Sequence, residues 1–316
     1  MKKKLLFIVI NILLILVGLF AIELYIWNKE NDSLKQRGVF PPNIEKLGFH
    51  KGIKKFNFDP KYFPTPENGY GRAPEGLNYK GKPLVIFGCS YAYGYQLEPT
   101  QTLSYKLAEK AKLPVYNRAF ISWGIQHMLY QSKVEDLYAT IPEPEYVMYV
   151  YINDHIRRLY LLSFSSWNIL EEEFNLRYKD KNDELIEIKN QNGILNQIKR
   201  LYLTNKIQHL LVNKEMNNQK NKEKRYDFAL KHFVEAKNEM QKHWNKTKFV
   251  VLFYNTTEDD EYLKNKLKEN DFIVLDTKEL TNADLATDEF LNQDKLHPNE
   301  NAWELIAEKL IKELKL

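Results

Sequence analysis

Short apolar runs that end in small or polar residues constrain the fold of this chain most. Residues 84–87, L-V-I-F, have the composition of a strand buried on both faces, and Gly88 ends the run. Ser90 comes two residues after this glycine. In open α/β sheets, sites form just beyond the carboxyl ends of parallel strands. Ser90 is therefore a candidate nucleophile, although a serine in this position more often only caps a turn or helix.

Further apolar runs alternate with segments of helical spacing. The expected strands are 114–116, 146–152, 249–254 and 272–275, and the expected helices are 102–111, 126–138 and 298–315. Strands that alternate with helices favour an α/β domain with a parallel sheet. The sequence thus predicts an α/β fold with a mostly parallel five-stranded sheet, in which three strand ends converge.

Asp294 and His297 lie three residues apart, just before the last expected helix. This spacing allows both side chains to face the same side, so that the carboxylate holds one imidazole nitrogen while the other accepts a proton. Considered one at a time, Asp294 could also be a helix cap and His297 a surface residue. Together with Ser90 they form a candidate Ser-His-Asp triad.

Four stretches, taken in order, resemble the sequence blocks of the SGNH (GDSL-like) hydrolases. They are G-C-S-Y-A-Y-G at 88–94, N-R-A-F-I-S-W-G at 117–124, Y-I-N-D at 151–154 and D-K-L-H-P-N at 294–299. The resemblance covers about residues 83–310, and the piece 68–72 resembles membrane-anchored bacterial members of the family. It implies a three-layer α/β/α sandwich of the flavodoxin-like type.

The resemblance also implies a role for each site residue. Ser90 is the expected nucleophile, His297 the general base and Asp294 the residue that orients the histidine. The expected oxyanion hole consists of the N–H groups of Ser90 and Ser122 and the side-chain amide of Asn153. The implied activity is that of a serine esterase. Together with the extracytoplasmic placement that the N-terminus favours, the resemblance predicts O-acyl groups of a cell-envelope glycan as substrates, with acetyl the expected group.

The sequence departs from the family pattern at three positions. Cys89 stands where the family usually has Asp, and Ser122 and Tyr151 stand where it usually has Gly. Ser122 keeps the backbone N–H that the oxyanion hole requires. Cys89, the single cysteine of the chain, is an alternative nucleophile, but a lone cysteine is more often a small buried hydrophobe.

The N-terminus has the pattern of a membrane anchor. Three lysines at 2–4 precede the charge-free segment 5–22, which is about long enough to span a bilayer. The lysines favour a cytoplasmic N-terminus. We expect residues 1–27 to form a single-pass signal anchor in the inner membrane, with the catalytic domain extracytoplasmic. A cleaved signal peptide is the alternative.

The remaining organisation follows from composition. Residues 28–82 are polar and proline-rich, which predicts a linker and an irregular lead-in. The hydrolase-like domain is expected at 83–316, with a helical insertion or cap at about 159–246. The net charge of +4, from 46 basic and 42 acidic residues, does not indicate nucleic-acid binding.

No Gly-rich phosphate loop and no metal-ligand spacing occurs in the sequence, so no cofactor or metal is expected. The expected partners are an ester substrate, such as an acylated glycan, and the membrane. Two alternatives to a hydrolase remain. One is an O-acyltransferase that uses the same acyl-enzyme, and the other is a non-catalytic envelope protein that binds a glycan or an assembly partner.

Overall fold

The computed structural model describes most of the domain that follows the N-terminal region. The described residues are 79–133, 135–160, 178–181, 184–187 and 210–316, together with Asn11, Val17, Gly18, Ala21 and Tyr25. The expected anchor at 1–27 and lead-in at 28–82 lie almost wholly outside them, as does most of 159–209. Among the described residues, no helix combines the length and apolar character that a membrane crossing requires.

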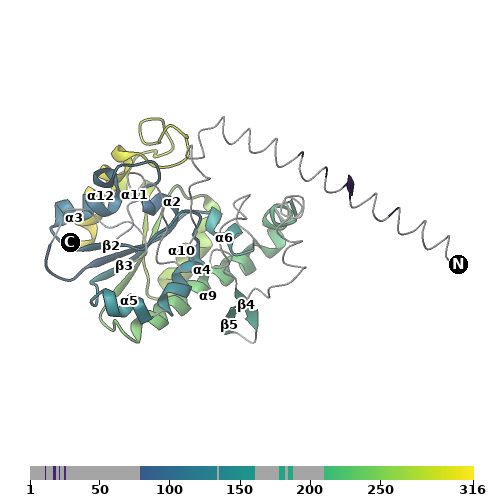
Figure 1. The fold of residues 1–316 in the computed structure, drawn as a ribbon, viewed down its shortest axis with the longest axis horizontal. Helices are drawn as coiled ribbons and strands as arrows, with labels where there is room; N and C mark the ends of the chain where they lie inside the picture. Colours follow the sequence, from purple (N-terminus) through teal and green to yellow (C-terminus); the bar gives the residue numbers. More distant parts are fainter. Residues whose placement is uncertain are drawn as a thin grey trace.

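A parallel sheet forms the centre of the described domain (Figure 1). Its strands are β1 (Leu84–Phe87), β2 (Val115–Asn117), β3 (Tyr146–Tyr151), β6 (Lys248–Phe253) and β7 (Ile273–Asp276). The strand order is β2-β1-β3-β6-β7, and every neighbouring pair is parallel. The predicted α/β fold with a five-stranded parallel sheet is confirmed for the part of the chain that the structure describes.

Helices cover both faces of this sheet (Figure 1). On one face lie α3 (Leu103–Ala111), α11 (Thr277–Thr281) and α12 (Glu300–Leu314), and on the other lie α4 (Ile125–Ser132), α5 (Glu135–Thr140), α9 (Lys222–Gln241) and α10 (Glu261–Glu269). The alternation of side chains along each strand supplies both cores. In β1, Leu84 and Ile86 pack on the first face, and Val85 and Phe87 pack on the second.

Short elements lie at the strand ends and in the connections. They are α2 (Ser90–Tyr93), α6 (Asp154–Arg158), the hairpin β4 (Tyr178–Lys181) and β5 (Glu184–Glu187), and the 3-10 helices η2 (Pro99–Gln101), η4 (Gln219–Asn221) and η5 (Glu258–Asp260). The expected helix at 126–138 is divided into α4 and α5. The last helix begins at Glu300 rather than at 298, because the side chain of Asn299 caps it by accepting from the N–H of Ala302.

The segment 159–246 differs from the expected insertion in its C-terminal part. Helix α9 belongs to the layer on the sheet, since Ala229, Phe233 and Met240 are fully buried in the core between this helix and the strands. The reason is topological: parallel β3 and β6 require a crossover connection, and α9 lies within it. It is part of the domain core rather than a cap outside it.

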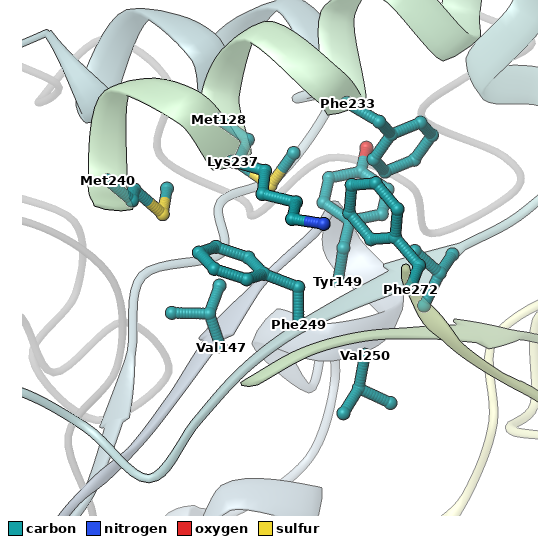
Figure 2. A pocket seen from close by; sticks show the side chains of 10 residues that line it. Met128, Val147, Tyr149, Phe233, Lys237, Met240, Phe249, Val250 and Phe272 are labelled. Atoms are coloured by element: carbon teal, nitrogen blue, oxygen red, sulfur yellow. The ribbon is translucent and has the colours of Figure 1, made fainter. Parts of the chain in front are cut away.

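Figure 2 shows the packing between α9 and the sheet. The cavity there measures about 10 Å³, which is about the space of one water molecule. The Lys237 ammonium lies 5.0 Å from the centroid of the Phe272 ring and donates to the carbonyl of Asn270 at 2.7 Å. This cavity is too small for a substrate.

We expect Gly88→Ala to destabilise the fold by about 1–3 kcal/mol. Gly88 has φ +152°, and an added Cβ would lie 2.9 Å from the Cβ of Ala92 and 3.1 Å from the carbonyl oxygen of Val150. Gly81→Ala is the matched control, because Gly81 has φ +125° but no neighbour within 4 Å of an added Cβ. Urea unfolding measures both variants, and equal losses would show that close packing at Gly88 is not the cause.

Candidate active site

The candidate site lies where β1, β2 and β3 end. Their parallel register pairs Ile86 with Asn117 and Phe87 with Tyr149, and adjacent strands lie about 4.8 Å apart. The residues that follow these strands therefore leave the sheet side by side. Gly88 permits the close approach of β1 to β3 at this edge. The topology thus brings the three expected motif segments to one edge of the sheet (Figure 1).

Ser90, His297 and Asp294 form one chain of hydrogen bonds. The Nε2 atom of His297 lies 2.8 Å from the Oγ atom of Ser90, and its Nδ1 atom lies 2.6 Å from Oδ2 of Asp294. A carboxylate only accepts, so Nδ1 carries a proton, and in a neutral imidazole Nε2 is then the acceptor that faces the hydroxyl. Ser90 is 7% exposed and belongs to the buried polar residues of the domain.

The Asp294 carboxylate is fixed by backbone donors as well. Its Oδ1 atom accepts from the N–H groups of Leu296 and His297, each at 3.0 Å. Burial would raise the pKa of Asp294, but the hydrogen bonds from His297 and from these amides outweigh it, and the pKa lies below its ordinary value. Asp294 therefore stays ionised and holds the imidazole in one orientation.

The loop that carries His297 is attached to the segment that carries Ser90. The Tyr91 hydroxyl donates to the carbonyl of Leu296 at 2.8 Å, and the Asn292 side-chain amide donates to the carbonyl of Tyr95 at 3.2 Å. Within the loop, the Asn292 N–H donates to the His297 carbonyl at 2.8 Å. These bonds fix the histidine beside the serine.

Two tyrosine rings flank the His297 imidazole. The ring centroids of Tyr91 and Tyr95 each lie 5.0 Å from that of the imidazole. Burial raises the pKa of both tyrosines, so neither forms a phenolate near neutral pH. The contacts of these two tyrosines with His297 could not be predicted from the sequence, because more than 200 residues separate each tyrosine from the histidine.

The backbone of the loop around Ser122 is strained, and the buried side chain of Arg158 donates a hydrogen bond to it. Ser122 has φ +67°, in the left-handed region that favours glycine. The next carbonyl, that of Trp123, accepts from Nη1 of Arg158 at 2.6 Å. Arg158 in turn donates from Nε to Oδ2 of Asp154 at 2.7 Å. The Ser122 amide therefore occupies a defined position.

The Asn153 amide is oriented by hydrogen bonds to groups other than Ser90, His297 and Asp294. Its Nδ2 atom donates to Oδ1 of Asp260 at 3.0 Å and to the hydroxyl of Tyr226 at 3.4 Å. Among the described residues, the hydrogen bonds bring Ser90, His297 and Asp294 together, and they join neither Ser122 nor Asn153 to these three. Asp260 and Tyr226 were not identified from the sequence.

The other reactive groups near the site are buried. Cys89 is fully buried, as a small hydrophobe would be. His155, which follows the Asn153 motif, is also fully buried, and its Nδ1 atom lies 3.0 Å from the Tyr149 hydroxyl. Burial and the charge of Arg158 hold the pKa of His155 well below its usual range. No cluster of His, Cys, Asp or Glu among the described residues has the arrangement of a metal site.

Comparison with known proteins gives low similarity. No family model and no curated protein matches the sequence. A lipolytic protein of the G-D-S-L family from Veillonella parvula is 14% identical, with 74% of this chain and 99% of that chain covered and a TM-score of 0.41. An acetyl xylan esterase from Butyrivibrio proteoclasticus is 7% identical, with 76% and 65% covered and a TM-score of 0.43. These similarities are low, and the function proposed below rests on the geometry of the site.

We expect Ser122→Gly to stabilise the protein by up to about 1 kcal/mol, because it removes the penalty of a side chain at φ +67°. Ser122→Ala keeps the Cβ and is expected to leave the free energy of unfolding near the wild-type value. Urea denaturation of the three proteins compares them. Equal stability of the Gly and Ala variants would contradict the explanation by backbone strain.

The Asp154–Arg158 pair is expected to make stability fall in acid. Burial alone would raise the pKa of Asp154, but the charge of Arg158 and the hydrogen bond from Arg157 outweigh it and lower the pKa from 3.8 to about 2. The stabilisation is therefore present above about pH 4 and is lost as the pH falls towards 2, to the extent of about 2 kcal/mol.

Urea unfolding between pH 6 and pH 2.5 tests this dependence. Asp154→Asn should be less stable than the wild type near pH 6 and should lose less stability on acidification. Asp288→Asn is the control, since this side chain is 81% exposed, and it should follow the wild-type curve. Parallel curves for the wild type and Asp154→Asn would exclude Asp154 as the source.

Proposed function

We propose that this protein is a serine ester hydrolase of the SGNH type. The observation that carries the proposal is the hydrogen-bonded chain from Ser90 Oγ through His297 to Asp294, with distances of 2.8 and 2.6 Å. This geometry matches the requirement for an activated nucleophile, in which a base lies within hydrogen-bond reach of the hydroxyl and a third group orients the base.

In the proposed reaction, the Ser90 oxygen attacks the ester carbonyl while His297 Nε2 takes its proton. The protonated imidazole then gives this proton to the leaving alcohol, and an acyl-enzyme forms. Water, deprotonated by His297, attacks the acyl-enzyme and releases the acid and the free serine. Asp294 stays ionised and stabilises the positive charge of the imidazolium in both steps.

The oxyanion of each tetrahedral intermediate would be held by the N–H groups of Ser90 and Ser122 and by the Asn153 amide. The adjacent ends of β1, β2 and β3 support this assignment, since each delivers one of the three segments to the same edge. Of the two Asn153 hydrogen bonds, the contact to Tyr226 at 3.4 Å is the longer. An oxyanion would replace that contact and leave the one to Asp260 in place.

The proposed substrate is an O-acyl ester, acetyl above all, on a glycan of the cell envelope. The N-terminal pattern supports this assignment, since lysines 2–4 and the apolar segment 5–22 are typical of an inner-membrane signal anchor. Such an anchor would hold the catalytic domain on the extracytoplasmic side, where envelope glycans lie.

Labelling with a fluorophosphonate probe, together with hydrolysis of short-chain aryl esters, tests the nucleophile. The full-length protein in detergent should be labelled and active, and Ser90→Ala should be neither. Cys89→Ala is the matched control on the neighbouring residue and should keep both properties. Loss of activity in Cys89→Ala with retention in Ser90→Ala would identify the thiol as the nucleophile, and absence of labelling in the wild type would favour a binding protein.

We expect Asn153→Ala to lower kcat about a hundredfold or more, with KM nearly unchanged, because a lost oxyanion donor removes roughly 3 kcal/mol of stabilisation from the transition state only. Steady-state kinetics on an aryl acetate measure both constants. A rise in KM with unchanged kcat would instead assign Asn153 to substrate binding.

A further inference from the structure

Asp260 is a fully buried carboxylate that the proposed reaction does not use. It lies in the 3-10 helix η5, which follows β6. A buried carboxylate is unfavourable unless hydrogen bonds compensate for the lost water. Each of its two oxygens has two donors, and the two sets of donors lie on different parts of the chain.

The Oδ2 atom of Asp260 makes local bonds only. It accepts from the N–H of Thr257 at 3.0 Å and from the Thr257 hydroxyl at 3.2 Å, which forms a capping box at the start of η5. The hydrogen bonds of this oxygen alone are enough for the capping of η5, so capping does not require the bonds that the other oxygen makes.

The Oδ1 atom makes bonds to the neighbouring strand and its C-terminal end. It accepts from the Tyr151 hydroxyl at 3.0 Å and from Nδ2 of Asn153 at 3.0 Å, more than 100 residues away in sequence. The parallel pairing of Tyr151 with Phe253 brings the ends of β3 and β6 together and makes these contacts possible.

The contact determines how the Asn153 amide is oriented. An asparagine side chain can rotate by half a turn and exchange its oxygen and nitrogen, but a carboxylate accepts only and therefore selects the NH₂ end. With one N–H held by Asp260, the second points away from it and is left for another acceptor. The Tyr226 hydroxyl from α9 lies at 3.4 Å from the same nitrogen.

We propose that Asp260 is a positioning residue that orients the Asn153 amide for the oxyanion. The proposal rests on the proposed function, since it assigns a use to the Asn153 donor of that site. It extends the machinery to the connection after β6, outside the four motif segments. Asp260 touches neither substrate nor the reacting atoms and acts through Asn153 alone.

A double-mutant cycle on the full-length protein tests this role. Asp260→Asn keeps the size of the side chain but no longer selects the NH₂ end of Asn153, so kcat should fall about 10- to 100-fold with KM little changed. In the Asn153→Ala background, Asp260→Asn should cause no further fall in kcat. Equal falls in both backgrounds, or a change confined to KM, would overturn the proposal.

Tyr151→Phe is the matched control, because it removes the other hydrogen bond to Oδ1 of Asp260 and leaves the one to Asn153. It should keep kcat within about twofold, whereas a fall as large as that of Asp260→Asn would indicate a general effect of burial and overturn the proposal. If Asp260→Asn does not fold, Asp260→Ser replaces it in the cycle, because a hydroxyl can donate as well as accept and does not select the NH₂ end of Asn153. The expected and the contrary results are the same. An inactive, unlabelled wild type would overturn the proposed function together with this inference, whereas an active wild type with an additive cycle would overturn the inference alone.

Discussion

Parallel pairing of β1 with β2 and with β3 is the constraint on which the candidate site depends. It sets Ile86 level with Asn117 and Phe87 level with Tyr149, so the segments that follow these strands leave the same edge of the sheet. A slip of one residue in a strand would turn its side chains to the opposite face and exchange the two cores. The register that fills the cores therefore also fixes where Ser90, Ser122 and Asn153 lie.

His297 reaches the same edge by other means, since it follows no strand. Its loop is fixed by the Tyr91 hydroxyl on the Leu296 carbonyl and by the Asn292 amide on the Tyr95 carbonyl. These bonds join the loop before α12 to the turn after β1, the same two segments that carry His297 and Ser90. The position of the proposed base thus depends on side-chain hydrogen bonds, whereas that of the proposed nucleophile depends on the sheet.

This difference explains how much could be predicted from the sequence. The strands and the motif residues Ser90, Asp294 and His297 were predicted, because apolar runs and short motifs are local patterns. The roles of Asp260 and Arg158 were not predicted. They depend on hydrogen bonds to Asn153 and Trp123, which lie in other segments of the chain. Thr257 and Asp260 show a local capping pattern, but that pattern accounts for only one of the two carboxylate oxygens.

The carboxylates of Asp294 and Asp260 have the same pattern of hydrogen bonds, and each orients a different side chain. Each carboxylate gives one oxygen to local donors, the amides of Leu296 and His297 in one case and Thr257 in the other. Each gives its second oxygen to a nitrogen of a site side chain, at 2.6 Å for His297 and 3.0 Å for Asn153. Because a carboxylate only accepts, it selects one tautomer of the imidazole and one orientation of the amide. The local hydrogen bonds hold the carboxylates in place before a substrate binds. The folded protein therefore orients the side chains of His297 and Asn153 without help from the substrate.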